Sequence, residues 1–187
     1  GFWFQGKIER DSSGVPTGIS SGRMAPLLDS GGKPFSQKWF GDAEGLTFKD
    51  GAAYVSTEQD ARIIRYEFGD DLLAASSSIF GPRPPSERLA YNRGLEAIAT
   101  VPKGNLRAGS FVAVSEAPAR SGEDIRAFIW NEDSVQEFRV KSLNNFYITD
   151  ADFSPEGDLF LLERRFSPAE GPAMRLRRIG GTGIKPN

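Results

Sequence analysis

Apolar and polar residues alternate in short runs along most of the chain, and turn residues separate these runs. Alternation with a period of two, bounded by Gly, Pro, Asn or Asp, is typical of β-strands joined by hairpins. We therefore predict strands at 2–10, 45–59, 62–68, 95–101, 110–117, 126–131, 136–141, 151–164 and 173–179. The Pro-rich stretch 76–88 is predicted to be a connecting loop and not a strand. The pattern indicates an all-β chain.

Three segments of this pattern repeat with a period of about 50 residues. They are 42–58, 94–116 and 148–163, and each has an acid, a short apolar run, a turn with Gly, a second run and a closing Glu. The leading acids are Glu44, Glu96 and Asp150, and the closing acids are Glu58, Glu116 and Glu163.

A repeat of this length built from antiparallel strands is typical of the four-stranded blades of a β-propeller. A β-sandwich with accidental spacing is the alternative. A closed ring needs at least ~4 blades, and this chain covers about three to four. Residues 2–10 resemble a late strand of a preceding blade. We expect a single partial propeller domain over 1–187, with the missing blades supplied by the rest of the protein or by another chain.

Composition excludes several classes of function. The formal net charge of −2 and the pI near 5.4 give no electrostatic footprint for nucleic acid. No apolar stretch approaches the roughly 20 residues of a membrane span. The chain has no Cys and no His, which removes thiol chemistry, His–zinc sites and the Ser-His-Asp triad. Ser56 and Ser115 therefore have no imidazole to activate them, and a serine esterase is not expected.

Carboxylates are the remaining candidates for chemistry. If Glu44, Glu96 and Asp150 each begin an innermost strand, ring symmetry brings them together around one axis. Converging carboxylates need a proton, a Lys or Arg, or a cation, and all-oxygen ligands favour Ca²⁺ or Mg²⁺. The alternative is a structural role, in which each acid satisfies backbone N–H groups of the adjacent blade.

A structural role is favoured for the closing acids and for the tryptophans. Alternation places Glu163 on the same side as Leu159 and Leu161, where burial and pairing with an Arg are expected. Arg164 and Arg165 point to opposite faces, so only one of them can reach a site in the channel. Blade packing is the expected role of Trp3, Trp39 and Trp130.

Three segments carry a resemblance to a known family: DAEGL (42–46), NRGLEAIA (92–99) and ITDADFSPEGDLFLLERRFSPAEGPAMRLRRI (148–179). In this order they resemble the phytase-like β-propeller family, described as "esterase-like activity of phytase", with a match from Phe2 to Ile179. The resemblance implies a periplasmic or secreted protein. Because propeller phytases use Ca²⁺ to bind phosphate and activate water, it also implies a metal site at Glu44, Glu96 and Asp150. Glu96 and Asp150 would serve catalysis, and Arg93, Arg164 and Arg165 would bind substrate.

The leading hypothesis is a metal-dependent hydrolase of phosphate esters or related small anionic ligands. One alternative is a non-catalytic propeller that binds a protein or a glycan. Another is a lactonase-type propeller, in which Asn92 and Asn144 or Asn145 join the metal shell. Several Lys or Arg residues facing the metal would indicate phosphate, whereas an apolar pocket with Asn ligands would indicate a lactone.

Overall fold

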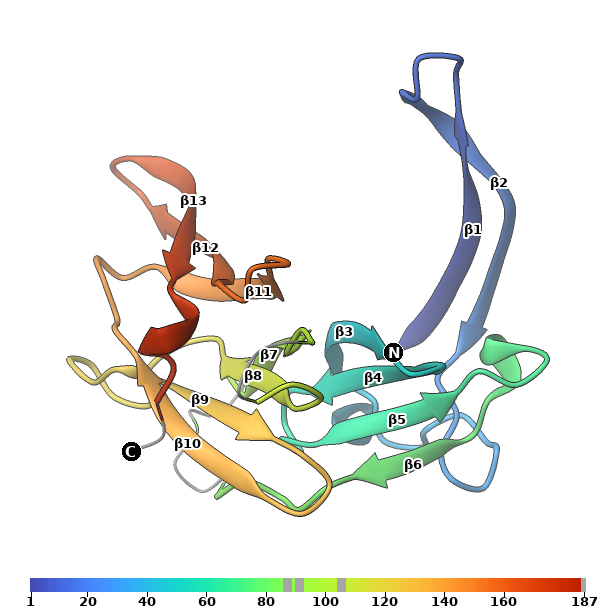
Figure 1. Cartoon of the computed structure of the whole chain (residues 1–187), viewed down its shortest axis with the longest axis horizontal. Coiled ribbons are helices and arrows are strands. Elements are labelled where there is room, and N and C mark those ends of the chain that lie inside the picture. The colour runs from blue at the N-terminus through green and yellow to red at the C-terminus, as the bar shows by residue number, and fades with distance from the viewer. Residues whose placement is uncertain (86–88, 90–92, 104–106, 186–187) are drawn as a thin grey trace.

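The computed structural model describes residues 1–85, 89, 93–103 and 107–185, and these form four antiparallel sheets (Figure 1). The first is a hairpin of β1 (Phe2–Arg10) and β2 (Pro16–Pro26). The next is β3 (Ala43–Lys49), β4 (Ala52–Thr57), β5 (Ile63–Glu67) and β6 (Ser77–Phe80). A second four-stranded sheet follows, with β7 (Leu95–Thr100), β8 (Phe111–Ser115), β9 (Ile125–Trp130) and β10 (Val135–Val140). The last sheet has β11 (Tyr147–Phe153), β12 (Leu159–Ser167) and β13 (Gly171–Ile179).

The all-β prediction is confirmed, since the described residues contain short 3₁₀ turns but no α-helix. Each sheet is a meander in which consecutive strands pair. Strand β7 packs against β3 on one side and against β11 on the other. The sheets follow one another in an arc, with the β1–β2 hairpin and the β11–β13 sheet at opposite ends (Figure 1). This arrangement is consistent with a partial propeller whose innermost strands are β3, β7 and β11.

The core lies between successive sheets and not within a single one. On β8, Phe111 and Ala113 pack toward the β3–β6 sheet, whereas Val112 and Val114 pack toward β11–β13. A sheet between two neighbours buries both faces, which explains why β4, β8 and β9 are apolar or small at nearly every position. Trp3 and Trp130 are buried as packing residues, as predicted. The side chain of Trp39 is outside the part that the structure describes.

The two ends of the arc expose apolar side chains. On β12, Leu159 and Leu161 face the β7–β10 sheet, and the opposite side of the sheet carries the exposed Phe166, Met174 and Leu176. On the hairpin, the ladder pairs Phe4 with Met24 and Ile8 with Ile19, all of them exposed. The end sheets therefore leave uncovered the kind of apolar face that the inner sheets bury.

Two strands were not predicted. Strand β6 falls within 76–88, so the loop prediction is wrong for its first residues. It is the edge strand of its sheet, pairs Ile79 with Ile64, and buries Phe80. A short edge strand shows little alternation of apolar and polar residues, and the prolines that follow it favoured a loop prediction. Strand β2, with its Gly and Ser residues, lacks the apolar run of a buried strand and is held by its ladder to β1.

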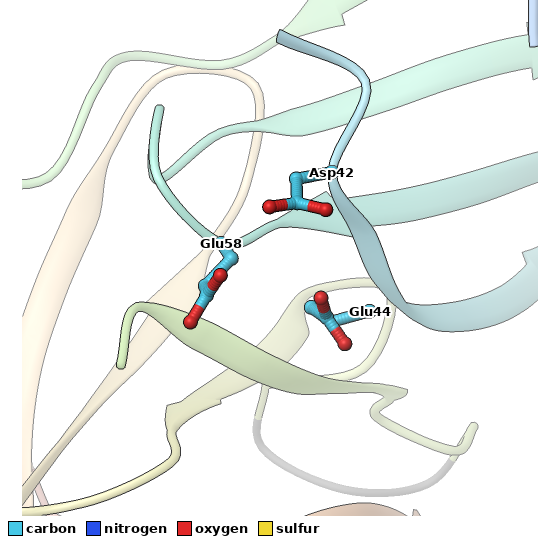
Figure 2. Close-up of side chains that lie close together, drawn as sticks. All are labelled: Asp42, Glu44 and Glu58. Carbon is cyan, nitrogen blue, oxygen red and sulfur yellow. The ribbon is translucent and has the colours of Figure 1, made fainter. Parts of the chain in front are cut away.

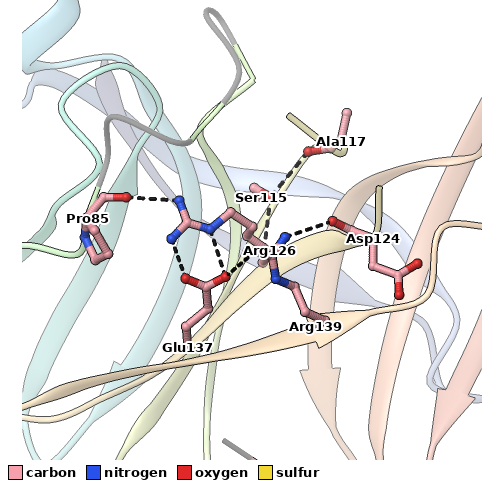
Figure 3. A network of polar contacts seen from close by, with 7 residues as sticks. All are labelled: Pro85, Ser115, Ala117, Asp124, Arg126, Glu137 and Arg139. Carbon is pink, nitrogen blue, oxygen red and sulfur yellow. Dashed lines mark hydrogen bonds and ion pairs between the residues drawn. The ribbon is translucent and has the colours of Figure 1, made fainter. Parts of the chain in front are cut away.

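A buried ion pair connects β9 and β10, the two outer strands of the β7–β10 sheet (Figure 3). Arg126 on β9 is 1% exposed. Its guanidinium forms a two-pronged pair with Glu137 on β10 and donates to the carbonyl of Pro85 at 2.9 Å. Arg139 also contacts Glu137 at 2.8 Å. A buried guanidinium is tolerated because its hydrogen bonds are satisfied, and here this network ties two strands to the loop that enters the sheet.

Candidate functional site: a carboxylate cluster between two sheets

Strands β3 and β7 each carry a β-bulge at a glutamate. In β3, Ala43 pairs with Thr57 and Leu46 with Val55, so that Glu44 and Gly45 face a single residue of β4. In β7, Leu95 pairs with Ser115 and Ala97 with Val114, which leaves Glu96 as the extra residue. A bulge redirects the side chain of its extra residue out of the regular ladder. Glu44 and Glu96 occupy this same special position in neighbouring sheets.

Two glycines let the neighbouring sheets approach closely enough to form the cluster. A Cβ on Gly45 would lie 2.7 Å from Ser56 Oγ and 2.8 Å from the backbone nitrogen of Ile98 in the next sheet. A Cβ on Gly94 would overlap the carbonyl oxygen of Glu58. Because no side chain fits at either position, the backbone segments bearing Glu44, Glu58 and Glu96 lie in direct contact.

The carboxylate cluster consists of Asp42, Glu44, Glu58, Glu96 and Glu116. One carboxylate oxygen from each of Asp42, Glu44 and Glu58 lies within 4.8 Å of the other two (Figure 2). Backbone hydrogen bonds hold the flanking residues, since the Glu58 N–H donates to Asp42 O at 2.9 Å and the Glu116 N–H donates to Gly94 O at 3.1 Å. The cluster thus joins two sheets at one edge.

Burial and the neighbouring negative charges both disfavour the ionised form of the cluster carboxyls. Burial and the charges of Glu44 and Glu116 raise the pKa of Glu96 to about 7, while Arg164 acts in the other direction. Burial also raises the pKa of Glu44, helped by Asp42 and Glu116, and that of Glu58, helped by Glu44 and Asp42. A group of carboxyls with raised pKa values keeps its protons to higher pH than free carboxyls do, unless a cation compensates the charge.

Two cations border the cluster. The Arg164 guanidinium lies 3.3 Å from the Glu116 carboxylate, and Lys38 Nζ lies 4.0 Å from that of Asp42. Both cationic side chains are well exposed, at 59% and 83%. They lower the pKa of Glu44 but do not cancel the effect of the neighbouring acids.

In the third sheet the bulge lies one residue before Asp150, the acid that the repeat aligns with Glu44 and Glu96. In β11, Ile148 pairs with Glu163 and Asp150 with Leu162, so the bulge falls at Thr149. Thr149, not Asp150, therefore matches Glu44 and Glu96. The same shift places Arg164 where the other sheets carry Glu58 and Glu116. Asp150 is exposed, and its carboxylate accepts the backbone N–H of Ala151 at 2.8 Å.

Glu163 lies apart from the cluster and is fully buried. It forms ion pairs with Arg175 and Arg177 of β13, the latter at 2.5 Å. Burial of Glu163 beside Leu159 and Leu161, with arginine partners, confirms the prediction from alternation. In the fold it matches Thr57 and Ser115, which are also buried.

The predicted substrate-binding arginines separate into two groups. Arg164 reaches the cluster, whereas Arg165 pairs with Glu170 in the turn between β12 and β13 and lies 5.0 Å from the centre of the Phe146 ring. This confirms that only one of the two faces the cluster. Arg93 lies 4.8 Å from the centre of the Tyr147 ring, and its Nη1 donates to Tyr147 Oη at 3.3 Å. Because Tyr147 pairs with Arg164 in the ladder, Arg93 borders the same edge.

The donor set of the cluster suits a hard cation. Ca²⁺ takes oxygen ligands at about 2.4 Å, so two oxygens on opposite sides of one ion are about 4.8 Å apart. The spacing among Asp42, Glu44 and Glu58 lies within that limit, and no nitrogen or sulfur donor competes. For the alternative lactonase shell, Asn92 is outside the described residues, and Asn145 lines a different pocket, with Tyr147 and Arg165.

These features define the class: an all-β protein of packed antiparallel sheets with a carboxylate cluster at the junction of two of them. A family model described as "Phytase-like: Esterase-like activity of phytase" matches residues 1–187, and the chain belongs to this family. A search of curated proteins finds no match. Among the described residues, no helix has the length and apolarity needed to cross a membrane.

Three members of the cluster, Asp42, Glu58 and Glu116, were not singled out as site residues from the sequence. The pairing of antiparallel strands could have indicated all three. The first strand of an antiparallel pair begins at the edge where the second ends, so Glu58 and Glu116 had to lie near Glu44 and Glu96. The same argument applies to Asp42, which directly precedes the Ala43–Thr57 pair and accepts the Glu58 N–H.

Proposed function

We propose that the carboxylate cluster is the site of a divalent-cation-dependent hydrolase acting on phosphate esters or related anionic substrates. The observation that carries this proposal is the convergence of Asp42, Glu44 and Glu58 next to Glu96, with Arg164 at the border. Membership of the phytase-like family supports a hydrolase.

Asp42, Glu44 and Glu58 would hold the cation. When bound, it would supply charge neutralisation of a phosphoryl oxygen and a lowered pKa of coordinated water. In this proposal Asp42 and Glu58 replace Asp150 as ligands, because Asp150 sits one residue beyond the bulge.

Glu96 would transfer a proton during hydrolysis. With a pKa of about 7, its carboxyl can both give and take a proton at neutral pH, as a general acid or base requires. Its place is beside the proposed ligands, since the charges of Glu44 and Glu58 both affect its pKa.

The cations at the border favour an anionic substrate over a lactone. Arg164 offers a planar guanidinium suited to phosphate, and Arg93 lies at the same edge, against Tyr147. Arg165 is occupied by Glu170 and has no role in this proposal.

Calorimetric titration of Ca²⁺ and Mg²⁺ into the chelator-treated full chain tests the site, together with hydrolysis of p-nitrophenyl phosphate. We expect saturable binding, and at least tenfold slower hydrolysis in chelator or in Glu44→Gln. Glu156→Gln, an exposed turn acid, should match wild type. Hydrolysis that persists unchanged both in chelator and in Glu96→Gln would overturn the proposal.

We further propose that additional sheets, from the rest of the protein or a second chain, cover the apolar faces at the two ends of the arc. Exposed Phe4 and Met24 on the hairpin and Met174 and Leu176 on β13 support this. Export to the periplasm or the medium is proposed from the family resemblance, and fractionation of the native cells tests it.

A further inference from the structure

The third sheet borders the carboxylate cluster with side chains that carry no negative charge. In the first sheet, the acids Asp42, Glu44 and Glu58 lie at the bulge and next to the pair that precedes it. The equivalent positions of the third sheet hold Tyr147, Thr149 and Arg164. This edge therefore offers a phenol, a hydroxyl and a guanidinium in place of the carboxylates, which suits the anionic part of a substrate and not a metal ion.

Tyr147 also holds a second arginine, Arg93, which comes shortly before β7. The guanidinium carbon of Arg93 lies 4.8 Å from the centre of the Tyr147 ring, and Nη1 donates to Tyr147 Oη at 3.3 Å. Within the part of the chain that the structure describes, Arg93 has no carboxylate partner, so its other N–H donors are open to a ligand. Stacking on the ring fixes the plane of the guanidinium, and a fixed plane favours bidentate binding of an anion.

Arg93 and Arg164 both lie next to Glu116. The Glu116 N–H donates at 3.1 Å to the carbonyl of Gly94, the residue after Arg93. The Glu116 carboxylate lies 3.3 Å from the Arg164 guanidinium. Tyr147 and Arg164 face each other in the ladder, where opposite side chains share one side of the sheet. Two arginines and one carboxylate thus lie around Tyr147, and one positive charge is left uncompensated.

This excess of positive charge distinguishes between phosphate esters. A phosphate monoester carries close to two negative charges near neutral pH, whereas a diester carries a single one. We propose that Tyr147 is a positioning residue that holds Arg93 beside Arg164, so that both guanidiniums bind the phosphate group of a monoester and select it over a diester. The inference rests on the function proposed above for the reaction, and it adds the substrate class and the role of Tyr147.

Calorimetric titration of methyl phosphate and dimethyl phosphate into the chelator-treated full chain tests the selection at about pH 7.5, where the monoester is largely dianionic. We expect saturable millimolar binding of methyl phosphate and about tenfold weaker binding of dimethyl phosphate. Arg93→Met and Tyr147→Leu should each weaken the binding of methyl phosphate about tenfold. Tyr147→Phe keeps the ring that stacks on Arg93 and should stay within about threefold of wild type.

NMR of the arginine side chains tests the positioning role directly. The Arg93 Nε–H signal should shift on addition of methyl phosphate in wild type and in Tyr147→Phe, but not in Tyr147→Leu. Arg178→Met is the matched control, since Arg178 is an exposed arginine of the same sheet that pairs with Asp158. Its affinity for methyl phosphate should equal that of wild type.

The inference is overturned if methyl phosphate does not bind, if the two esters bind equally, or if Arg93→Met binds as wild type, a result that does not depend on the folding of Tyr147→Leu. An Arg93 signal that still shifts in Tyr147→Leu would overturn the positioning role. Because the titrations contain chelator, they are independent of the proposed cation site. Cation-dependent hydrolysis without this binding would contradict the present inference alone, and binding without any hydrolysis would contradict the proposed hydrolase alone.

Discussion

Arg164 of β12 places its guanidinium 3.3 Å from the Glu116 carboxylate of the preceding sheet. The two residues occupy equivalent positions, each directly after the residue that pairs across the bulge. A position that is acidic in two sheets is thus basic in the third. The third sheet consequently contributes a positive charge at the border of the cluster, which lowers the pKa of Glu44 and Glu96.

Replacing Arg164 by Met should raise the pKa of both Glu44 and Glu96, because a positive charge that lowers both pKa values is lost. Carboxyl NMR titration of the chelator-treated protein measures this. Arg178→Met removes an exposed arginine of the same sheet that pairs with Asp158, and it should leave both values unchanged. Unchanged titration of Glu96 in Arg164→Met would show that the guanidinium does not act on the cluster.

The raised pKa of Glu96 makes stability depend on pH. The folded state keeps its proton up to about pH 7, whereas the unfolded group loses it near 4.5. The unfolded state therefore binds fewer protons between these values, and stability falls as pH rises through the window. Glu96→Gln should flatten this decline, leaving the variant about 1 kcal/mol more stable above pH 7, after allowance for solvent screening.

Thermal unfolding from pH 4 to 8 in chelator measures that effect. Glu156→Gln, in an exposed turn, provides the comparison. Parallel curves for wild type and Glu96→Gln would contradict the predicted titration.

Ca²⁺ should stabilise the wild-type fold by mass action, by about 2.7 kcal/mol at 100 times its Kd. Asp42→Asn should lose most of this gain, since Asp42 is one of three converging carboxylates. Asp150→Asn should keep it, since Asp150 lies outside the bulge. Denaturant unfolding with and without Ca²⁺ measures the gain for each variant. If Asp150→Asn lost the gain and Asp42→Asn kept it, Asp150 would be the ligand instead.

Gly94→Ala should destabilise the fold by about 3 kcal/mol, because the new methyl group overlaps the Glu58 carbonyl oxygen and forces the sheets apart. Gly18→Ala on β2 meets no atom within 4 Å and should change stability by less than about 0.5 kcal/mol. Urea unfolding measures both. Equal stability of the two variants would mean that the close approach at Gly94 is not required.

Glu163→Gln should cost about 3–5 kcal/mol, because Arg175 and Arg177 would lose a fully buried counter-charge. Glu170→Gln weakens only the pair with Arg165, in which the Glu170 side chain is 62% exposed, and should cost less than about 1 kcal/mol. The midpoints of urea unfolding report the difference. A small effect of Glu163→Gln would mean that the buried arginines find other partners.

Much of the fold could be predicted from the sequence because strand periodicity is a local property. The run 2–10 becomes β1 with the same limits, and the hairpin turns at Asp50 and Gly51 show the positive φ values that Asp-Gly favours. Strand β6 was missed because its pairing to β5, and not its own pattern, makes it a strand.

Local patterns in the chain are enough to predict the alternation, the repeated unit, the absence of His and Cys chemistry, and the acids at each strand end. Which of these acids meet depends on how the strands pair and the sheets pack. Bulges at Glu44 and Glu96 bring their charges close enough to interact, while the equivalent bulge in β11 falls at Thr149 and leaves Asp150 one residue beyond it. Spacing cannot reveal where a bulge lies, because bulges follow from the pairing of two strands and from the packing of neighbouring sheets.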